Sequence, residues 1–216
     1  MTGDRLQTTI LSSRLLPNAD PAPLAQLQVP EGHRSLALFT TDCDDVSYAA
    51  VDEATKKARV SVIYAKSFYA GSANANTALA GEFIGILSGP TPADVRSGLD
   101  AAIRYATEEA AFISAREDDS VVYFAHCISR TGSYLSAQAN VPEGTAMAYL
   151  IAPPLEAMIG LDAAVKSANV TLQVFYGPPT ETNFAGGLLT GQQAACQAAC
   201  DAFADTVRNI AATPRI

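Results

Sequence analysis

Short apolar runs alternate with longer amphipathic stretches along this chain, and the pattern predicts a mixed α+β protein. Runs typical of strands, short and rich in apolar residues, occupy 6–16, 35–40, 60–64, 82–87, 121–128, 146–151 and 170–176. Stretches typical of helices occupy 22–27, 46–59, 92–109, 155–167 and 192–211. The order strand, strand, helix, strand, strand, helix is expected in each half, which predicts a small mixed sheet with helices on one face.

A repeated tetrapeptide supports the division into two similar halves. Val29-Pro30-Glu31-Gly32 returns as Val141-Pro142-Glu143-Gly144, and a strand, a break and a helix follow each copy. The spacing between equivalent positions drifts along the chain, as expected where the loops of two copies differ in length. The acidic break at 117–119 marks the junction, and we expect one domain at 1–113 and a second at 114–216.

Two long segments without a persuasive period occupy matching positions in the two halves, at 66–81 and 177–187. Loops of this length inside compact units are more often functional than idle. Because the two halves are similar, we expect both loops to point to a shared rotational axis.

The composition indicates that apolar surface is buried between subunits. Hydrophobic residues make up 49% of the chain and charged residues only 17%, which leaves little polar material to coat two free monomeric domains. The formal net charge of -8 argues against a nucleic-acid partner, because phosphate backbones are bound by clustered Lys and Arg. No apolar run reaches the ~18 to 20 residues that span a bilayer, and no signal-peptide core follows the N-terminus. We therefore expect a soluble cytoplasmic protein without a membrane partner.

The motifs do not indicate an enzyme. Cys127 follows His126, but neighbouring residues of a strand point to opposite faces, so the two cannot form a nucleophile and its base. The four cysteines lack the spacing of a disulfide framework, and we interpret them as buried small side chains. We expect no catalytic residue, no cofactor and no metal.

Carboxylates gather where the helix at 46–59 begins, at Asp42, Asp44 and Asp45. Their simplest role is to accept hydrogen bonds from unpaired backbone N–H groups and to favour the positive end of the helix dipole. Asp44, Asp45 and Glu82 could instead surround a divalent metal ion, because such ions prefer oxygen ligands. The residues alone leave these roles open.

Several longer strings in the chain resemble one known family. The strings are V-S-Y-A-A-V-D-E-A-T-K-K at 46–57, S-F-Y-A-G at 67–71, S-R-T-G-S-Y-L-S at 129–136, M-A-Y-L-I-A-P-P-L-E-A at 147–157 and Y-G-P-P-T-E-T-N-F at 176–184. They are similar to the ethanolamine-utilisation shell proteins of bacterial microcompartments. The resemblance extends over nearly the whole chain and is weakest at 1–30.

This resemblance implies two circularly permuted, ferredoxin-like shell domains in tandem. Three chains would form a pseudohexameric homotrimer that tiles edge to edge with other shell proteins around enzymes. The long loops would gate a central pore for substrates, products or cofactors, with Phe68, Tyr69, Asn183 and Phe184 as plugging residues. Ordinary loop packing is the alternative for these four residues, and an ungated structural tile is the alternative for the chain.

The resemblance also implies a small channel within each chain, between the two domains, that binds ethanolamine. The matching positions are Asp44, Asp45, Glu82 and the backbone near Phe112 and Cys127. Carboxylates and carbonyl groups suit an ammonium ion, and one donor or acceptor suits the hydroxyl group. A shell protein of an ethanol or propanediol compartment would have the same fold and assembly, so the fold alone does not distinguish these cargoes.

Overall fold

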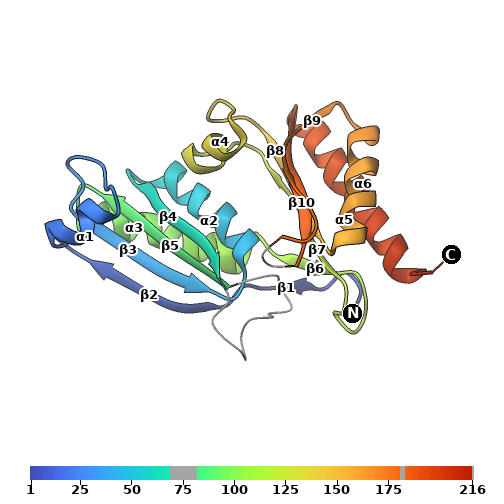
Figure 1. Ribbon diagram of the computed structural model, residues 1–216, viewed down its shortest axis with the longest axis horizontal. Helices are drawn as coiled ribbons and strands as arrows, with labels where there is room; N and C mark the ends of the chain where they lie inside the picture. Colours follow the sequence, from blue (N-terminus) through green and yellow to red (C-terminus); the bar gives the residue numbers. More distant parts are fainter. Residues whose placement is uncertain (69–81, 181–182, 216) are drawn as a thin grey trace.

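The computed structural model describes residues 1–68, 82–180 and 183–215, and it contains two sheets, each with its own helices (Figure 1). The first sheet and its helices form unit 1. Its four antiparallel strands lie in the order β2 (Ile10–Leu16), β3 (Ser35–Thr41), β5 (Glu82–Gly89) and β4 (Ser61–Phe68). Its helices are α1 (Pro21–Gln26), α2 (Asp44–Lys57) and α3 (Pro92–Arg104), which continues into the π-helical turn η1 (Tyr105–Glu109).

The second sheet and its helices form unit 2. Its six strands lie in the order β1 (Arg5–Leu6), β6 (Phe112–Ser114), β7 (Val122–Ile128), β8 (Met147–Ala152), β10 (Ala185–Gly191) and β9 (Val170–Tyr176). Its helices are α4 (Ser133–Ala139), α5 (Pro154–Ser167) and α6 (Gln193–Ala212). Helices α5 and α6 cover one face of the sheet, and the other face is turned toward unit 1 (Figure 1).

The two units share one topology. The order β2-β3-β5-β4 in unit 1 is repeated as β7-β8-β10-β9 in unit 2, with every pairing antiparallel. The repeated tetrapeptide also folds alike in both: Gly32 and Gly144 have φ angles of 84° and 83°, a region that favours glycine. The sequence repeat is therefore a repeat of structure.

Strands β1 and β6 complicate the junction between the units. Arg5 and Leu6 at the start of the chain pair with Ile113 and Phe112, so the N-terminus belongs to the sheet of unit 2. The expected division between 113 and 114 falls inside β6. That division stays a prediction.

The structure also differs from the expected element bounds: the strand expected at 6–16 is divided into β1 and β2, and the helix expected at 92–109 is α3 followed by η1. Helix α4 was not expected, because its N-cap is Gly132, which has no side chain to signal a helix start. Strand β4 continues through Phe68, since 66–68 pair with β5, and the second expected loop ends where β10 begins at Ala185. Residues 66–67 and 185–187 are small or polar, and they pair as strands because β5 lies beside 66–67 and β8 and β9 lie beside 185–187.

One hydrophobic cluster joins the units. It includes Val46 and Ala50 of α2 together with Phe124 of β7 and Tyr149 of β8. The small side chains on α2 let the helix approach closely on both sides. In the described part of the chain, no helix is both long and apolar enough to cross a membrane.

Candidate functional site

A cavity of about 510 Å³ lies between the two units and is the candidate functional site. Unit 1 contributes the first turns of α2 and the end of β4, and unit 2 contributes α4, β8, β9 and residues that precede β10. We call this cavity the inter-unit pocket. Its volume falls in the ~300–1,000 Å³ range of small-molecule sites, which often lie between domains.

The first turn of α2 places two buried carboxylates in the pocket, because Asp44 and Asp45 are only 3% and 6% exposed. Neither is the N-cap, which is Cys43, and the Cys43 side chain makes no capping bond. Asp44 Oδ1 accepts a 2.9 Å hydrogen bond from Asp45 N, and Asp44 Oδ2 accepts a 2.7 Å bond from Ser67 Oγ. Asp44 is thus held by its own helix and by β4.

Asp45 is bonded across the boundary between the units. Its Oδ1 accepts a 2.7 Å hydrogen bond from Tyr149 Oη on β8. Burial raises the pKa of Asp45 well above its ordinary value and the nearby Asp44 carboxylate raises it further, whereas the Tyr149 bond lowers it. A cation in the pocket would offset both of the unfavourable effects, so the electrostatics favour a positively charged ligand.

Aromatic rings form much of the remaining wall. Tyr48 of α2 stacks on Tyr134 of α4, with ring centroids 6.1 Å apart and an interplanar angle of 5°. The Tyr48 hydroxyl accepts a 2.9 Å hydrogen bond from Ser67 N. Tyr176 of β9 lies with its ring centroid 6.3 Å from that of Tyr149. Aromatic faces attract cations, so the wall and the carboxylates favour the same ligand charge.

The other residues predicted to bind a ligand lie at different distances from this pocket. Glu82 is 5% exposed and begins β5, where its register partner is the pocket-lining Phe68. Phe112 is fully buried in β6, and its ring meets that of the pocket-lining Phe184 edge to face at 5.9 Å between centroids. The binding roles of Glu82 and Phe112 stay predictions.

Cys127 has its side chain on the helix-covered face of the unit 2 sheet. Its Sγ lies 3.8 Å from Gln193 O at the start of α6, and burial raises the pKa of the thiol to about 11. The thiol is therefore neutral near pH 7. The prediction concerned the backbone near Cys127, and it stays a prediction.

The predicted gate residues lie beside the same pocket where the structure describes them. Phe68 ends β4 and Phe184 precedes β10, and both line the pocket. Asn183 has a φ of 65°, and nearby Thr180 N donates a 2.9 Å hydrogen bond to Phe184 O. Tyr69 lies outside the described residues. The gate role of these four residues stays a prediction.

Sequence reasoning missed the aromatic wall. Tyr48, Tyr134, Tyr149 and Tyr176 line the pocket, which is half of the eight tyrosines in the chain. They come from four separate elements, so no local spacing connects them. A signal was available in the composition, because tyrosine supplies a polar tip on an apolar body and suits the wall of a wet pocket.

The carboxylates do not form a metal site in this structure. Within 1–68, 82–180 and 183–215, no group of three or more His, Cys, Asp or Glu side chains is arranged to hold a metal ion.

The fold and the pocket define a tandem protein, with two copies of one α+β unit and a ligand-sized cavity between them. Residues 35–117 match the family model described as BMC domain, the domain of bacterial microcompartment shell proteins. The shell protein EutL of Clostridium perfringens is 56% identical over 99% of both chains. This chain belongs to the EutL family of bacterial microcompartment shell proteins, and the members that it matches are structural shell proteins and not enzymes.

Solved structures agree with this assignment. The crystal structure of the ethanolamine utilization protein EutL from Leptotrichia buccalis has a TM-score of 0.95 at 63% identity, with both chains covered completely. EtuB from Clostridium kluyveri has a TM-score of 0.80 at 19% identity, over 94% of this chain and 88% of that one, which shows a shared fold alone. The expected fold class, two microcompartment shell domains in one chain, is confirmed.

Proposed function

We propose that this chain is a gated tile in the shell of a microcompartment for ethanolamine degradation, that it works as a homotrimer, and that its inter-unit pocket binds ethanolamine. Relatives described as EutL and as an ethanolamine utilization protein support the choice of compartment. The main observation in support of a homotrimer is that the equivalent helices α2 and α5 are buried to different extents.

Helices α2 and α5 occupy the same place in the two units, and their buried small residues correspond, as in Ala54 and Ala164. Both helices contain 14 residues, yet ten are buried in α2 and four in α5. The reason is that α2 lies between its own sheet and unit 2, whereas no other element in the described part of the chain covers the outer side of α5 (Figure 1). Helix α5 thus has one covered side where α2 has two.

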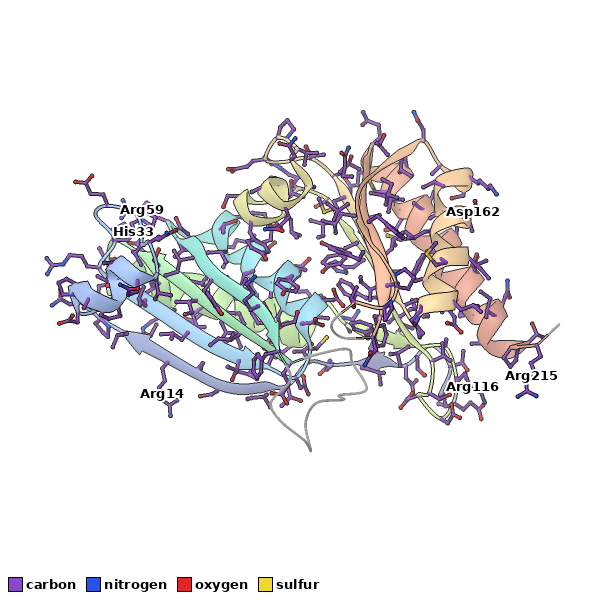
Figure 2. The ribbon with its side chains drawn as sticks, viewed as in Figure 1. Arg14, His33, Arg59, Arg116, Asp162 and Arg215 are labelled. Carbon is purple, nitrogen blue, oxygen red and sulfur yellow. The ribbon has the colours of Figure 1, made fainter. Side chains whose placement is uncertain are left out.

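The outer side of α5 carries four exposed apolar side chains beside the exposed ion pair of Lys166 with Asp162. The apolar side chains are Leu155, Met158, Ile159 and Val165, at 59%, 43%, 48% and 39%. Asp162 lies on α5, on the unit 2 side of the molecule (Figure 2). Exposed apolar stripes of this kind mark interaction surfaces.

The repeat indicates what covers this stripe. Its positions correspond to Asp45, Tyr48, Ala49 and Thr55 of α2, which lie on the side that faces unit 2. If unit 2 packs against α2 within one chain, then unit 1 of a second chain can pack against α5 in the same way. Three chains joined head to tail by this contact close into a ring of six units.

The pocket chemistry supports ethanolamine as the ligand. The ammonium group would lie beside Asp45 and Asp44, where it offsets the cost of burying two carboxylates. Ser67 and the tyrosine hydroxyls offer donors and acceptors for the alcohol. The loops at 66–81 and 177–187 would gate the central pore through Phe68, Tyr69, Asn183 and Phe184.

Two measurements test this proposal. Analytical ultracentrifugation should give a trimer, and a stable monomer would overturn the assembly. Calorimetric titration should give heat with ethanolamine and little with propane-1,2-diol, which lacks the ammonium group, and Asp45→Asn should weaken ethanolamine binding. The exposed Asp205→Asn is a matched control that should bind as the wild type does. Equal heats for Asp45→Asn and the wild type would remove the ligand site.

The gate has its own test, because an ungated tile is the competing function. Structures of the trimer with and without ethanolamine should show two arrangements of the loops at 66–81 and 177–187. If the two loops kept one arrangement with and without ethanolamine, the gate would be refuted and the chain would be an ungated structural tile.

A further inference from the structure

The N-terminus of α4 is capped by a carboxylate from the other unit. Asp52 lies in the middle of α2 and is fully buried. Its Oδ2 accepts a 2.7 Å hydrogen bond from Gly132 N, and its Oδ1 accepts a 2.8 Å bond from Leu135 N. These bonds satisfy backbone donors that a helix start leaves unpaired.

Two neighbours of Asp52 bind the same segment. Thr55 Oγ1 accepts a 3.0 Å hydrogen bond from Ser133 N, and Lys56 Nζ donates a 3.0 Å bond to Arg130 O. Asp52, Thr55 and Lys56 lie on one side of α2 at helical spacing. We call these three residues and their bonds to 130–135 the α2–α4 clamp.

The close approach of α2 explains why α4 has no cap of its own. A Cβ atom at Gly132 would lie 2.2 Å from Thr55 Oγ1 and 2.5 Å from Asp52 O, so no side chain fits there. In unit 1 the equivalent helix α1 is capped locally, because Asp20 Oδ1 accepts a 2.8 Å bond from Ala22 N. Unit 2 has a glycine where unit 1 has its capping residue, and α2 supplies the missing acceptor.

Helix α4 is also a wall of the inter-unit pocket. Tyr134, Leu135 and Gln138 line the cavity, and Tyr134 stacks on Tyr48 of α2. Asp52 is not among the pocket-lining residues. Its bond to Leu135 N nevertheless fixes the turn of α4 that carries Tyr134, so Asp52 can influence the pocket through α4.

We propose that Asp52 is a positioning residue for ligand binding: by capping α4 from the other unit, it fixes the pocket wall at the distance that a bound organic cation requires. This proposal rests on the proposed function, because it takes ethanolamine to be the ligand bound in the inter-unit pocket. The charged environment is consistent with this role, because Lys56 Nζ lies 3.8 Å from Asp52 Oδ2 and also pairs with Glu53. The carboxylate therefore has one cation and two backbone donors around it.

The test compares two substitutions of adjacent buried residues in α2. Asp52→Asn keeps the shape of the side chain but turns an NH₂ group toward one of the two backbone N–H donors. Val51→Ala is the matched control, because it removes core methyl groups and lowers stability without touching the clamp. The readouts are amide hydrogen exchange at 132–139 and the ethanolamine affinity from calorimetry.

We expect Asp52→Asn to accelerate exchange at 132–139 and weaken ethanolamine binding, each about tenfold, since a hydrogen bond to a charged group is lost. Val51→Ala should leave both values near those of the wild type. Equal effects of the two variants would overturn the proposal, because Asp52 would then matter only for stability. If Asp52→Asn does not fold, Thr55→Val is the second variant: it removes the acceptor for Ser133 N together with the bond that Thr55 Oγ1 donates to Asp52 O within α2. Unchanged exchange at 132–139 in that variant would also overturn the proposal.

The two readouts separate this proposal from the proposed function. If the wild type gives no heat with ethanolamine, the ligand assignment fails, and with it the positioning role toward that ligand. Accelerated exchange at 132–139 in Asp52→Asn would then still show that Asp52 holds α4. If the wild type binds ethanolamine and Asp52→Asn binds it equally well, only the positioning role fails.

Discussion

Tyr149 of strand β8 donates a 2.7 Å hydrogen bond to the carboxylate of Asp45 on helix α2, from a position 104 residues further along the chain. Both side chains are buried, and the bond joins unit 2 to the first turn of α2 in unit 1. It holds a carboxylate in the wall of the inter-unit pocket, and it is one of the contacts that fix the geometry between the two units.

Removing this hydroxyl should destabilise the protein. Tyr149→Phe leaves Asp45 Oδ1 without its tyrosine donor in a buried site, and we expect a loss of about 1–3 kcal/mol in the free energy of unfolding, measured in urea at fixed protein concentration. The control is Tyr123→Phe, whose hydroxyl accepts only a long 3.4 Å bond from Arg208. Equal losses in the two variants would contradict a special role for the Tyr149 bond.

The raised pKa of Asp45 predicts how the stability of the folded protein changes with pH. Because burial and Asp44 raise its pKa in the folded state, the folded protein retains a proton that the unfolded chain releases above about pH 4. The Asp45 contribution to stability should therefore fall as pH rises from about 4 toward the folded-state pKa. In unfolding experiments across this range, the stability of the wild type relative to Asp45→Asn should therefore decrease as pH rises. Parallel curves for the two proteins would refute this assignment.

His126 should act in the opposite direction. Burial, with smaller contributions from Arg5 and Lys56, lowers its pKa to about 4, and Tyr105 Oη lies 2.6 Å from its Nε2. The unfolded chain therefore takes up a proton near pH 6.5 that the folded protein takes up only near pH 4, and stability should be lost as pH falls through that window. Unfolding of His126→Gln should show a smaller loss, with His33→Gln as the control that keeps it. A proton NMR titration that placed His126 near 6.5 would contradict the prediction.

A charge on the outer side of α5 should prevent assembly. Ile159→Lys places an ammonium group in the proposed contact between chains, where burial would be costly, and we expect sedimentation to show smaller species than the wild type. Ala198→Lys is the control, because it lies on α6, whose equivalent α3 packs on its own sheet. A trimer in Ile159→Lys, or dissociation of both variants, would place the contact elsewhere.

Much of the fold was predictable because its signals are local. The tetrapeptide turn, the cap and proline at Thr91 and Pro92, and the acidic start of α2 each encode their own element. Helix α4 was not predictable in this way, because its cap, Asp52, lies 80 residues before Gly132. Strands β1 and β6 are two and three residues long, and pairing with each other and with β7 defines them.

Part of the candidate site was also predictable from local sequence, and the rest depends on how the two units pack together. Asp44 and Asp45 stand at a helix start, so their sequence position and a family resemblance together suggested them. The tyrosines of the wall lie on separate elements, and only packing of unit 2 against α2 brings them together. Cys127 shows the reverse case, because it is close in sequence to pocket elements but its side chain faces α6.

By itself, the sequence determined the duplication, the order of most elements and the carboxylates at the start of α2, since each follows from nearby residues and their periodicity. Only the tertiary structure decided that α2 is buried on two sides and α5 on one, that Asp52 caps a helix of the other unit, and that four tyrosines surround Asp45 and Asp44. The physical reason is that these features depend on contacts between residues far apart in the chain, and the packing of the two units sets those contacts.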